Sequence, residues 1–305
     1  LFMDEFDCVL VKTAPEITLK SSNVRKYFTD KLVKNLKGSF RQQGLAGSAG
    51  TKITRNEGRL YIYAEQKKLK KILKLLGNTF GVFAYAQAQS FSSSSLKDIV
   101  EKVTAIAETE LEKTKTFAVR AKFPNEKSFR SKDVEIEAGS AILAKMPKLK
   151  VNLGSPEKTI FVEGRQGRVF VYSELIDGPA GLPVSCQGSV AVLFDGTNES
   201  MVSAWLMLKR GCSVFPIVEK KSKKIEKQTE LLVRWNAGRS FKLTPMSELS
   251  GLIEKPDISV KAIVKSNETF SKSIEKEKSS LQIPVYAPLL FFPADIKKRI
   301  VGVLQ

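Results

Sequence analysis

One stretch, Val190-Ala191-Val192-Leu193-Phe194-Asp195-Gly196-Thr197-Asn198-Glu199-Ser200, decides the fold of the C-terminal part of the chain. Its short apolar run predicts a strand that is buried on both faces, as in a parallel sheet covered by helices. Polar residues and a glycine follow, and helical spacing of apolar residues begins at Glu199. Ligands of such sheets bind at the carboxyl ends of the strands, so we expect a functional site in the Phe194–Ser200 turn.

Strands and helices continue to alternate beyond this stretch. The helices are expected at Glu199–Arg210, at Lys223–Ala237 before Gly238, and from about Pro293; the strands are expected at Ser213–Val218 and Ile258–Val264. This alternation predicts an α/β domain built on a doubly wound parallel sheet. The glycine- and proline-rich stretch Asp177–Pro183 precedes it and predicts a domain boundary.

The first eighty residues predict a different order of elements. An apolar strand at Phe6–Lys12 precedes a helix capped by Ser22, and two strands then flank the Asn56-Glu57-Gly58 turn. A second helix stops at Gly77, and a strand runs from Gly81 to Gln89. The apolar face of the first helix consists of Val24, Phe28, Leu32 and Leu36. The order β-α-β-β-α-β is that of a ferredoxin-like domain.

The middle of the chain predicts a further α/β domain. Ser90–Ser95 reads as a polar linker and helix cap, and a strand at Thr116–Phe123 and a helix at Ser131–Lys145 follow. Three more strands are expected at Lys148–Leu153, Thr159–Glu163 and Val169–Ser173. We therefore expect an α+β and α/β multidomain protein with three domains, at residues 1–77, 78–176 and 177–305.

The charge of the chain indicates a polyanionic partner. Lys and Arg number 50 against 32 Asp and Glu, which gives a formal net charge of +18 over 305 residues. A field of this sign attracts nucleic acid and speeds its capture. The basic residues are spread over several elements, and no apolar run approaches the roughly 20 residues of a membrane-spanning helix. We expect no membrane partner, and an acidic N-terminus without a basic signal region favours a cytoplasmic location.

Histidine and cysteine usage narrows the chemistry. The chain has no histidine, which excludes acid–base catalysis and metal ligation by imidazole from these residues. The three cysteines, Cys8, Cys186 and Cys212, are far apart in sequence, which fits a reducing compartment and no local zinc or redox motif. We expect Cys8 and Cys212 to pack in cores, and Cys186 to be exposed.

The sequence resembles the tRNA 4-thiouridine synthetase family over nearly its whole length and in the same order. Three regions carry the resemblance: the opening segment, the segment similar to a THUMP domain, and the connector and helix of the C-terminal part. The matching residues are Pro15–Ser21 with Asn23–Arg25; Thr116–Lys122, Phe129–Glu135, Gly139, Ala141–Leu143 and Lys150–Gly154; and Asp177–Pro179, Gly181–Val184, Ala204–Gly211, Ile283–Val285 and Pro288–Leu289.

The resemblance implies tRNA as the partner, bound at its acceptor end by the ferredoxin-like and THUMP domains. By position, the candidates for the RNA face are Lys20, Arg25, Lys26, Arg120, Lys122, Lys127, Arg130 and Arg165. Alternation along a strand also puts Arg120 and Lys122 on one side. Such cations give affinity and salt dependence rather than sequence readout, and the alternative is that each is an ordinary solvated charge.

The resemblance also implies a PP-loop domain that uses ATP and Mg²⁺ to adenylate a uridine before sulfur displaces AMP. The family's loop is Ser-Gly-Gly-Phe/Ile-Asp-Ser. This chain has Asp195-Gly196-Thr197-Asn198-Glu199-Ser200 in its place, so only Gly196 and Ser200 match. A carboxylate at Asp195 repels phosphate, and the β-branched Thr197 stands where glycine allows close approach.

Two interpretations of this loop are open. A Mg²⁺ ion could bridge Asp195 or Glu199 to the phosphates of ATP. Alternatively, Asp195 and Asn198 cap the helix, and the loop holds another ligand or none. The basic run Glu219–Lys227 is predicted at the same sheet edge, either as a solvated helix face or beside an RNA backbone.

The predicted function is therefore tRNA binding in 4-thiouridine synthesis with an impaired nucleotide loop; the alternative is an active ATP-dependent tRNA uridine thiolase. No cysteine matches the family's C-terminal catalytic cysteine, and the chain ends at Gln305, before that region. We therefore assign no catalytic residue and no metal ligand, and expect a separate sulfur-donor protein. A homodimer is a further expectation. A THUMP methyltransferase is disfavoured, since no Asp-Pro-Pro-Tyr-like motif occurs.

Overall fold

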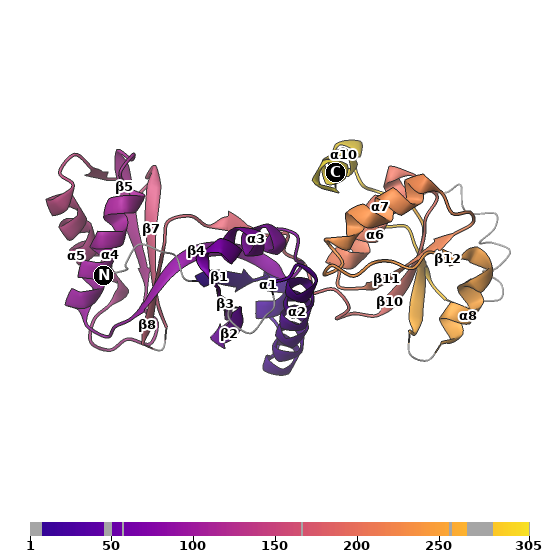
Figure 1. Ribbon diagram of the computed structural model, residues 1–305, viewed down its shortest axis with the longest axis horizontal. Coiled ribbons are helices and arrows are strands. Elements are labelled where there is room, and N and C mark those ends of the chain that lie inside the picture. Colours follow the sequence, from indigo (N-terminus) through magenta and orange to yellow (C-terminus); the bar gives the residue numbers. More distant parts are fainter. Residues whose placement is uncertain are drawn as a thin grey trace. The chain divides into compact units, whose positions relative to one another are not determined.

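The computed structural model describes residues 8–45, 51–56, 58–165, 167–255, 258–266 and 283–304. The chain divides into two units (Figure 1). The first consists of Leu1–Lys12, Ser48–Leu73 and Ala84–Asp177, and the second of Thr13–Gly47, Lys74–Phe83 and Gly178–Gln305. The ferredoxin-like segment thus contributes its strands mainly to the first unit and its first helix to the second. The three domain ranges stay a prediction.

The first unit is built on a nine-stranded sheet with the order β2-β3-β1-β4-β8-β7-β5-β6, in which β9 also pairs with β4. Its strands are β1 (Cys8–Thr13), β2 (Lys52–Asn56), β3 (Arg59–Tyr63), β4 (Val82–Ser92), β5 (Thr116–Lys122), β6 (Lys150–Val151), β7 (Lys158–Arg165), β8 (Arg168–Tyr172) and β9 (Ile176–Asp177). The order β2-β3-β1-β4 with helices after β1 and β3 is that of a ferredoxin-like domain, which confirms the prediction.

Strand β4 is shared between the two halves of this sheet. Its start pairs with β9, and its end pairs antiparallel with β8 through residues Gln89 to Ser92. The predicted linker therefore lies partly inside a strand, because the backbone of Ser90 and Ser92 is held by β8. On the β5–β8 half, helices α4 (Leu96–Glu110) and α5 (Ser131–Lys145) pack against apolar side chains such as Phe117, Val119 and Ile160.

A buried carboxylate connects four strands of this unit. The hydroxyl of Tyr172 donates to Glu163 Oε1 at 2.8 Å. Arg59 Nε and Lys12 Nζ lie 3.5 and 3.7 Å from the same carboxylate, and Arg165 Nη2 lies 3.9 Å away. Because these residues belong to β1, β3, β7 and β8, one carboxylate links the ferredoxin-like strands to the THUMP-like strands.

The second unit contains the parallel sheet that the sequence predicted. Its order is β12-β11-β10-β13-β14, and every recorded pairing is parallel. The strands are β10 (Ser189–Leu193), β11 (Ser213–Val218), β12 (Thr244–Pro245), β13 (Val260–Val264) and β14 (Val285–Tyr286). The first strand in sequence is central and its neighbours run outward in both directions, which is the doubly wound arrangement.

Both faces of this sheet are covered. Val190, Val192 and Phe194 pack into a core with α6 (Asn198–Lys209), α7 (Lys223–Val233) and α10 (Ala294–Leu304). Ala191 and Leu193 point to the other face, where they pack with α8 (Leu249–Glu254). Figure 1 shows α6 and α7 along the strands β10 and β11. The continuous apolar run of β10 follows from this two-sided burial.

Two further helices of this unit come from the N-terminal part, α1 (Pro15–Thr18) and α2 (Ser22–Gln42); α3 (Gln66–Leu76) begins in the first unit. The expected cap of α2 was wrong, because Ser21 occupies the cap position and Ser22 is the first helical residue. Val24 is 39% exposed, whereas Phe28, Leu32 and Leu36 are buried as expected.

Several short or terminal elements differ from the prediction. Helix α7 ends at Val233, four residues before the predicted end at Ala237, and β13 begins at Val260 instead of Ile258. The helix α8, the 3-10 turn η1 (Met246–Glu248) and the two-residue strand β12 were not predicted. Elements this short contain too few residues to show a hydrophobic period.

Candidate functional site

The loop from Asp195 to Ser200 lies where the sheet changes direction. It follows the carboxyl end of β10, the strand whose neighbours β11 and β13 run outward on opposite sides. Gly196 has a φ of +81°, a conformation that favours glycine, and this turn carries the chain into α6. The sequence therefore placed the candidate loop correctly at the topological switch point, which is the usual ligand site of this fold.

Hydrogen bonds within the loop satisfy the donors of Thr197 and Ser200. Asp195 Oδ1 accepts from the backbone N–H of Thr197 at 2.9 Å and from the Thr197 hydroxyl at 2.6 Å. Thr197 Oγ1 accepts in turn from the backbone N–H of Ser200 at 3.2 Å. A carboxylate of the protein thus receives one backbone N–H, that of Thr197, which a PP-loop would offer to a phosphate oxygen.

The cap of α6 differs from the predicted one. Thr197 is the N-cap residue, and Asn198 is the first residue of the helix and is exposed. Asp195 does not cap the helix itself. Its carboxylate accepts hydrogen bonds from the hydroxyl and the backbone N–H of Thr197, the N-cap residue. The hydroxyl of Ser200, one of the two residues that match the family loop, donates to Thr197 O at 2.9 Å.

One residue of the site was missed by the sequence analysis. Gln228 on α7 is buried, and its Nε2 donates to the carbonyl oxygens of Gly196 and Thr197, both at 3.2 Å. Its Oε1 is buried without a hydrogen-bond partner. The available signal was a polar residue among the apolar positions Ile225 and Leu232 of α7, an arrangement that calls for a buried partner.

The charges around the loop bear on whether it could hold Mg·ATP. The Asp195 carboxylate fills the position of an acceptor in the loop, and it repels a further anion. Among the residues that the structure describes, no group of three or more acidic or cysteine side chains could hold a metal ion. Lys224 does lie beside the loop, since a Cβ at Gly196 would meet its Cδ at 3.8 Å. The basic run thus reaches the predicted sheet edge.

In the first unit, four of the predicted RNA-binding residues lie along one continuous segment. Arg120 and Lys122 are both exposed at the carboxyl end of β5, Lys127 lies in the following loop, and Arg130 precedes α5. Arg120 donates to Leu153 O. Arg130 pairs with Asp133 at 3.1 Å, so its charge is partly compensated. We call this segment, residues 120–130, the β5–α5 corner.

The remaining predicted RNA-binding residues are placed differently. Lys20, Arg25 and Lys26 are exposed around the end of α1 and the first turn of α2, in the second unit. Arg165 is only 9% exposed and is one of the cations around the Glu163 carboxylate. We call this group, Glu163 with Lys12, Arg59, Arg165 and Tyr172, the Glu163 cluster. The Arg165 side chain is thus buried near a carboxylate, whereas Arg120, Lys122 and Lys127 of the β5–α5 corner are exposed.

In the described part of the chain the three cysteines form no disulfide, and one prediction about them was wrong. Cys186 is only 6% exposed; its Sγ lies close to Gly211, and Tyr27 on α2 donates to its carbonyl at 3.3 Å. Burial raises the pKa of Cys186 to about 12 and also raises the pKa of Cys212. Cys8 is fully buried in β1, as expected.

We expect Cys186 to react very slowly with iodoacetamide at pH 8. With a pKa of about 12, roughly one thiol in ten thousand is ionised at that pH, against about a quarter for an ordinary cysteine. Mass spectrometry of timed samples should therefore show alkylation at least about 100-fold slower than for free cysteine. The urea-unfolded chain is the control, in which all three thiols should react. Fast labelling of Cys186 in the folded chain would contradict this assignment.

Comparison with known protein families identifies two domains in the N-terminal part of the chain. Residues 8–86 match the model of the ThiI ferredoxin-like domain, and residues 93–174 match that of the THUMP domain. The chain is 33% identical over 243 residues to a probable tRNA sulfurtransferase of Saccharolobus solfataricus, covering 77% of this chain and 61% of that protein. It is 35% identical over 217 residues to a probable tRNA sulfurtransferase of Methanobrevibacter smithii, covering 70% and 53%.

The chain thus spans less than two thirds of the length of these two curated relatives. Among solved structures, PH1313 from Pyrococcus horikoshii is similar with a TM-score of 0.82, 25% identity and coverage of 98% of this chain and 99% of that one. A 4-thiouridine synthetase in complex with RNA and bound ATP has the same fold, with a TM-score of 0.77, 21% identity and coverage of 98% and 85%. In the described part of this chain, no helix is long and apolar enough to cross a membrane.

Proposed function

This chain belongs to the family of THUMP-domain tRNA sulfurtransferases, and from that premise we propose that it binds tRNA and serves tRNA thiolation without using ATP at its own loop. The observation that carries the second half of this proposal is the hydrogen bonding of Asp195 to Thr197, which occupies the nucleotide loop from within. The protein then acts as the tRNA-binding component of the reaction.

The RNA-binding half of the proposal rests on charge and exposure. The β5–α5 corner presents Arg120, Lys122 and Lys127 to solvent beside the N-terminus of α5, whose helix dipole also attracts anions. Lys20, Arg25 and Lys26 form a second exposed group. We assign Arg165 to the Glu163 cluster and not to the RNA face.

The proposal also includes the partners and the location. A separate protein donates sulfur, because Cys8 and Cys186 are buried and the burial of Cys212 raises its pKa. Reduced, widely spaced thiols fit the cytoplasm. Light scattering of the purified chain tests the expected homodimer through its molar mass.

Arg120→Ala/Lys122→Ala is expected to weaken tRNA binding about tenfold, because each cation contributes a phosphate contact. In fluorescence anisotropy at several salt concentrations, the slope of log K against log salt should fall in magnitude by about two. Lys97→Ala/Lys113→Ala, in the first turn of α4 and in the turn after it, removes the same charge from other exposed positions of the unit. If the unmodified chain does not bind tRNA at low salt, the proposed function is wrong.

A second candidate function is an active ATP-dependent tRNA uridine thiolase. It is favoured by one observation, the presence of a glycine with positive φ and a helix N-terminus at the switch point of the sheet. In that case Glu199 and Ser200 would lie near the pyrophosphate. The solved 4-thiouridine synthetase of the same fold holds ATP. The two candidates differ in ATP binding, which is tested below.

A further inference from the structure

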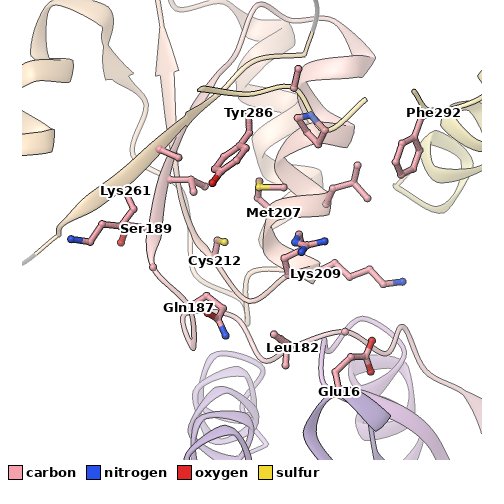
Figure 2. A pocket seen from close by; sticks show the side chains of 18 residues that line it. Glu16, Leu182, Gln187, Ser189, Met207, Lys209, Cys212, Lys261, Tyr286 and Phe292 are labelled. Carbon is pink, nitrogen blue, oxygen red and sulfur yellow. The ribbon is translucent and has the colours of Figure 1, made fainter. Parts of the chain in front are cut away.

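The second unit has a hollow of about 1050 Å³ away from the nucleotide loop (Figure 2). It is lined at the start of β10 by Ser189 and Val190, at the start of β13 by Lys261, and at the end of α6 by Met207 and Lys209. These are the amino-terminal ends of the parallel strands, whereas the Asp195–Ser200 loop follows the carboxyl end of β10. The hollow is therefore a different place on the sheet from the candidate nucleotide site.

The charges around the hollow favour an anion. Lys209, Arg210 and Lys261 line it, and Glu16 is the one acidic residue among its lining side chains in the described part of the chain. Arg210 and Lys261 are exposed. Three cations against one carboxylate leave an excess of positive charge, which is what a phosphate-bearing ligand requires.

The carbonyl groups at the end of α6 do not compete with a phosphate for these cations, because they already accept hydrogen bonds from backbone N–H groups. Leu182 N donates to Lys209 O at 2.9 Å, Gly211 N to Leu208 O at 2.9 Å, and Cys212 N to Met207 O at 3.0 Å. Gly181, with a φ of +74°, allows this close approach, since a Cβ there would lie 2.5 Å from Lys209 O. The hollow thus offers a phosphate cationic side chains and no free helix carbonyls from these residues.

Aromatic and apolar side chains provide the rest of the lining. Tyr286 is 55% exposed, and Phe292 lies on the same segment after β14; Figure 2 shows both around the hollow with Met207. Gln187 and Ser189 add hydrogen-bonding groups. The Tyr286 ring is exposed and the Phe292 ring is partly buried; rings combined with cations form the type of surface on which unpaired bases stack while their phosphates are neutralised.

From this combination we propose that the hollow binds a short single-stranded segment of RNA, with bases on Tyr286 and Phe292 and phosphates at Lys209, Arg210 and Lys261. Its volume is at the upper limit for a small-molecule pocket, which favours more than one nucleotide over a free mononucleotide. A duplex is disfavoured, because its bases are stacked on one another and present no faces to the rings. The inference rests on the proposed function in that its ligand is also RNA.

The test measures binding of fluorescein-labelled hexauridylate by anisotropy, with a blunt RNA hairpin and AMP as competitors. The host is the Arg120→Ala/Lys122→Ala chain, so that binding at the β5–α5 corner does not mask the signal. Tyr286→Ala is expected to weaken hexauridylate binding about tenfold, as for the loss of one stacked base. Lys261→Ala should lower the salt slope by about 0.7. Both side chains are exposed, and circular dichroism checks that the variants stay folded.

Two controls match these changes. Phe291→Ala removes a ring that is 91% exposed and adjacent to the hollow without lining it, and Lys255→Ala removes an exposed cation outside it. Neither should alter hexauridylate binding. Equal binding by the host and Tyr286→Ala would overturn the inference, as would an equal loss in the controls. Competition by AMP at the same concentration as hexauridylate would also overturn it, in favour of a mononucleotide pocket.

Failure of this inference can be told from failure of the proposed function. If the unmodified chain binds whole tRNA but hexauridylate binding does not depend on Tyr286, only the single-strand site is wrong. If the unmodified chain binds neither RNA, then RNA binding itself is wrong and both proposals fall together.

Discussion

Mg·ATP is expected to give no heat of binding with the unmodified chain in isothermal titration calorimetry, and measurable binding with Asp195→Ser/Thr197→Gly. The double substitution removes the carboxylate that holds the N–H of residue 197 and lets a phosphate approach the backbone closely. Two like charges 4 Å apart repel by about 4 kcal/mol near a protein surface, close to a thousandfold in Kd. We therefore expect a Kd that falls from above about 1 mM into the micromolar range.

The single variant Thr197→Gly is the matched control for this experiment. It opens the backbone but keeps Asp195, so it should still bind no ATP. Loss of the Thr197 cap in favour of glycine costs only a few tenths of a kcal/mol, so the helix should stay folded. Clear heat with the unmodified chain would refute the occupied-loop proposal and favour the active thiolase.

Glu163→Gln is expected to lower the stability of the first unit by about 3–5 kcal/mol at pH 7, because it leaves Lys12, Arg59 and Arg165 without their shared carboxylate. For a unit of this size the thermal midpoint should fall by about 6 to 20 °C, measured by circular dichroism or calorimetry. Glu137→Gln on the exposed face of α5 is the control and should change the midpoint little. An unchanged midpoint in Glu163→Gln would show that the cluster is not stabilising.

This effect should depend on pH in a defined direction. Desolvation by burial acts to raise the pKa of Glu163, but the Tyr172 hydroxyl and the neighbouring Arg59, Lys12 and Arg165 outweigh it, so the pKa is lowered from 4.5. A carboxylate whose pKa is lowered on folding contributes stability above its unfolded pKa and loses it as the pH falls through the folded pKa. The difference between the two chains should therefore be full at pH 6–8 and shrink below about pH 4.5.

The fold could be predicted well from the sequence where the signal is local. The apolar run of β10 predicted a parallel sheet, and the spacing of Phe28, Leu32 and Leu36 predicted the buried face of α2. The predictions failed where an element was too short to show a pattern, or where two neighbouring residues fitted the same role equally well. Elements of two to six residues carry no period, and Ser22 and Ser21 are equally good caps in sequence.

The candidate site was predicted only in part. The sequence located the Asp195–Ser200 loop and named the residues that break the family pattern, because a turn after a buried strand is a local feature. It did not identify Gln228, which reaches the loop from another helix, and its capping alternative named Asp195 and Asn198, whereas the N-cap is Thr197. Several side chains near the loop could form these hydrogen bonds, and the path of the backbone decides which of them do.

The sequence by itself determined the class of this protein: its order of elements, its excess of positive charge and the altered residues of its nucleotide loop. Only the tertiary structure decided which charges face solvent and which are buried. Arg165 and Arg120 are the same residue type on neighbouring strands, yet Arg165 lies against Glu163 while Arg120 is exposed. Likewise Cys186 is buried, and its neighbours come from other parts of the sequence: its Sγ lies close to Gly211, and Tyr27 donates to its carbonyl. Burial is set by long-range packing, and local composition carries no record of it.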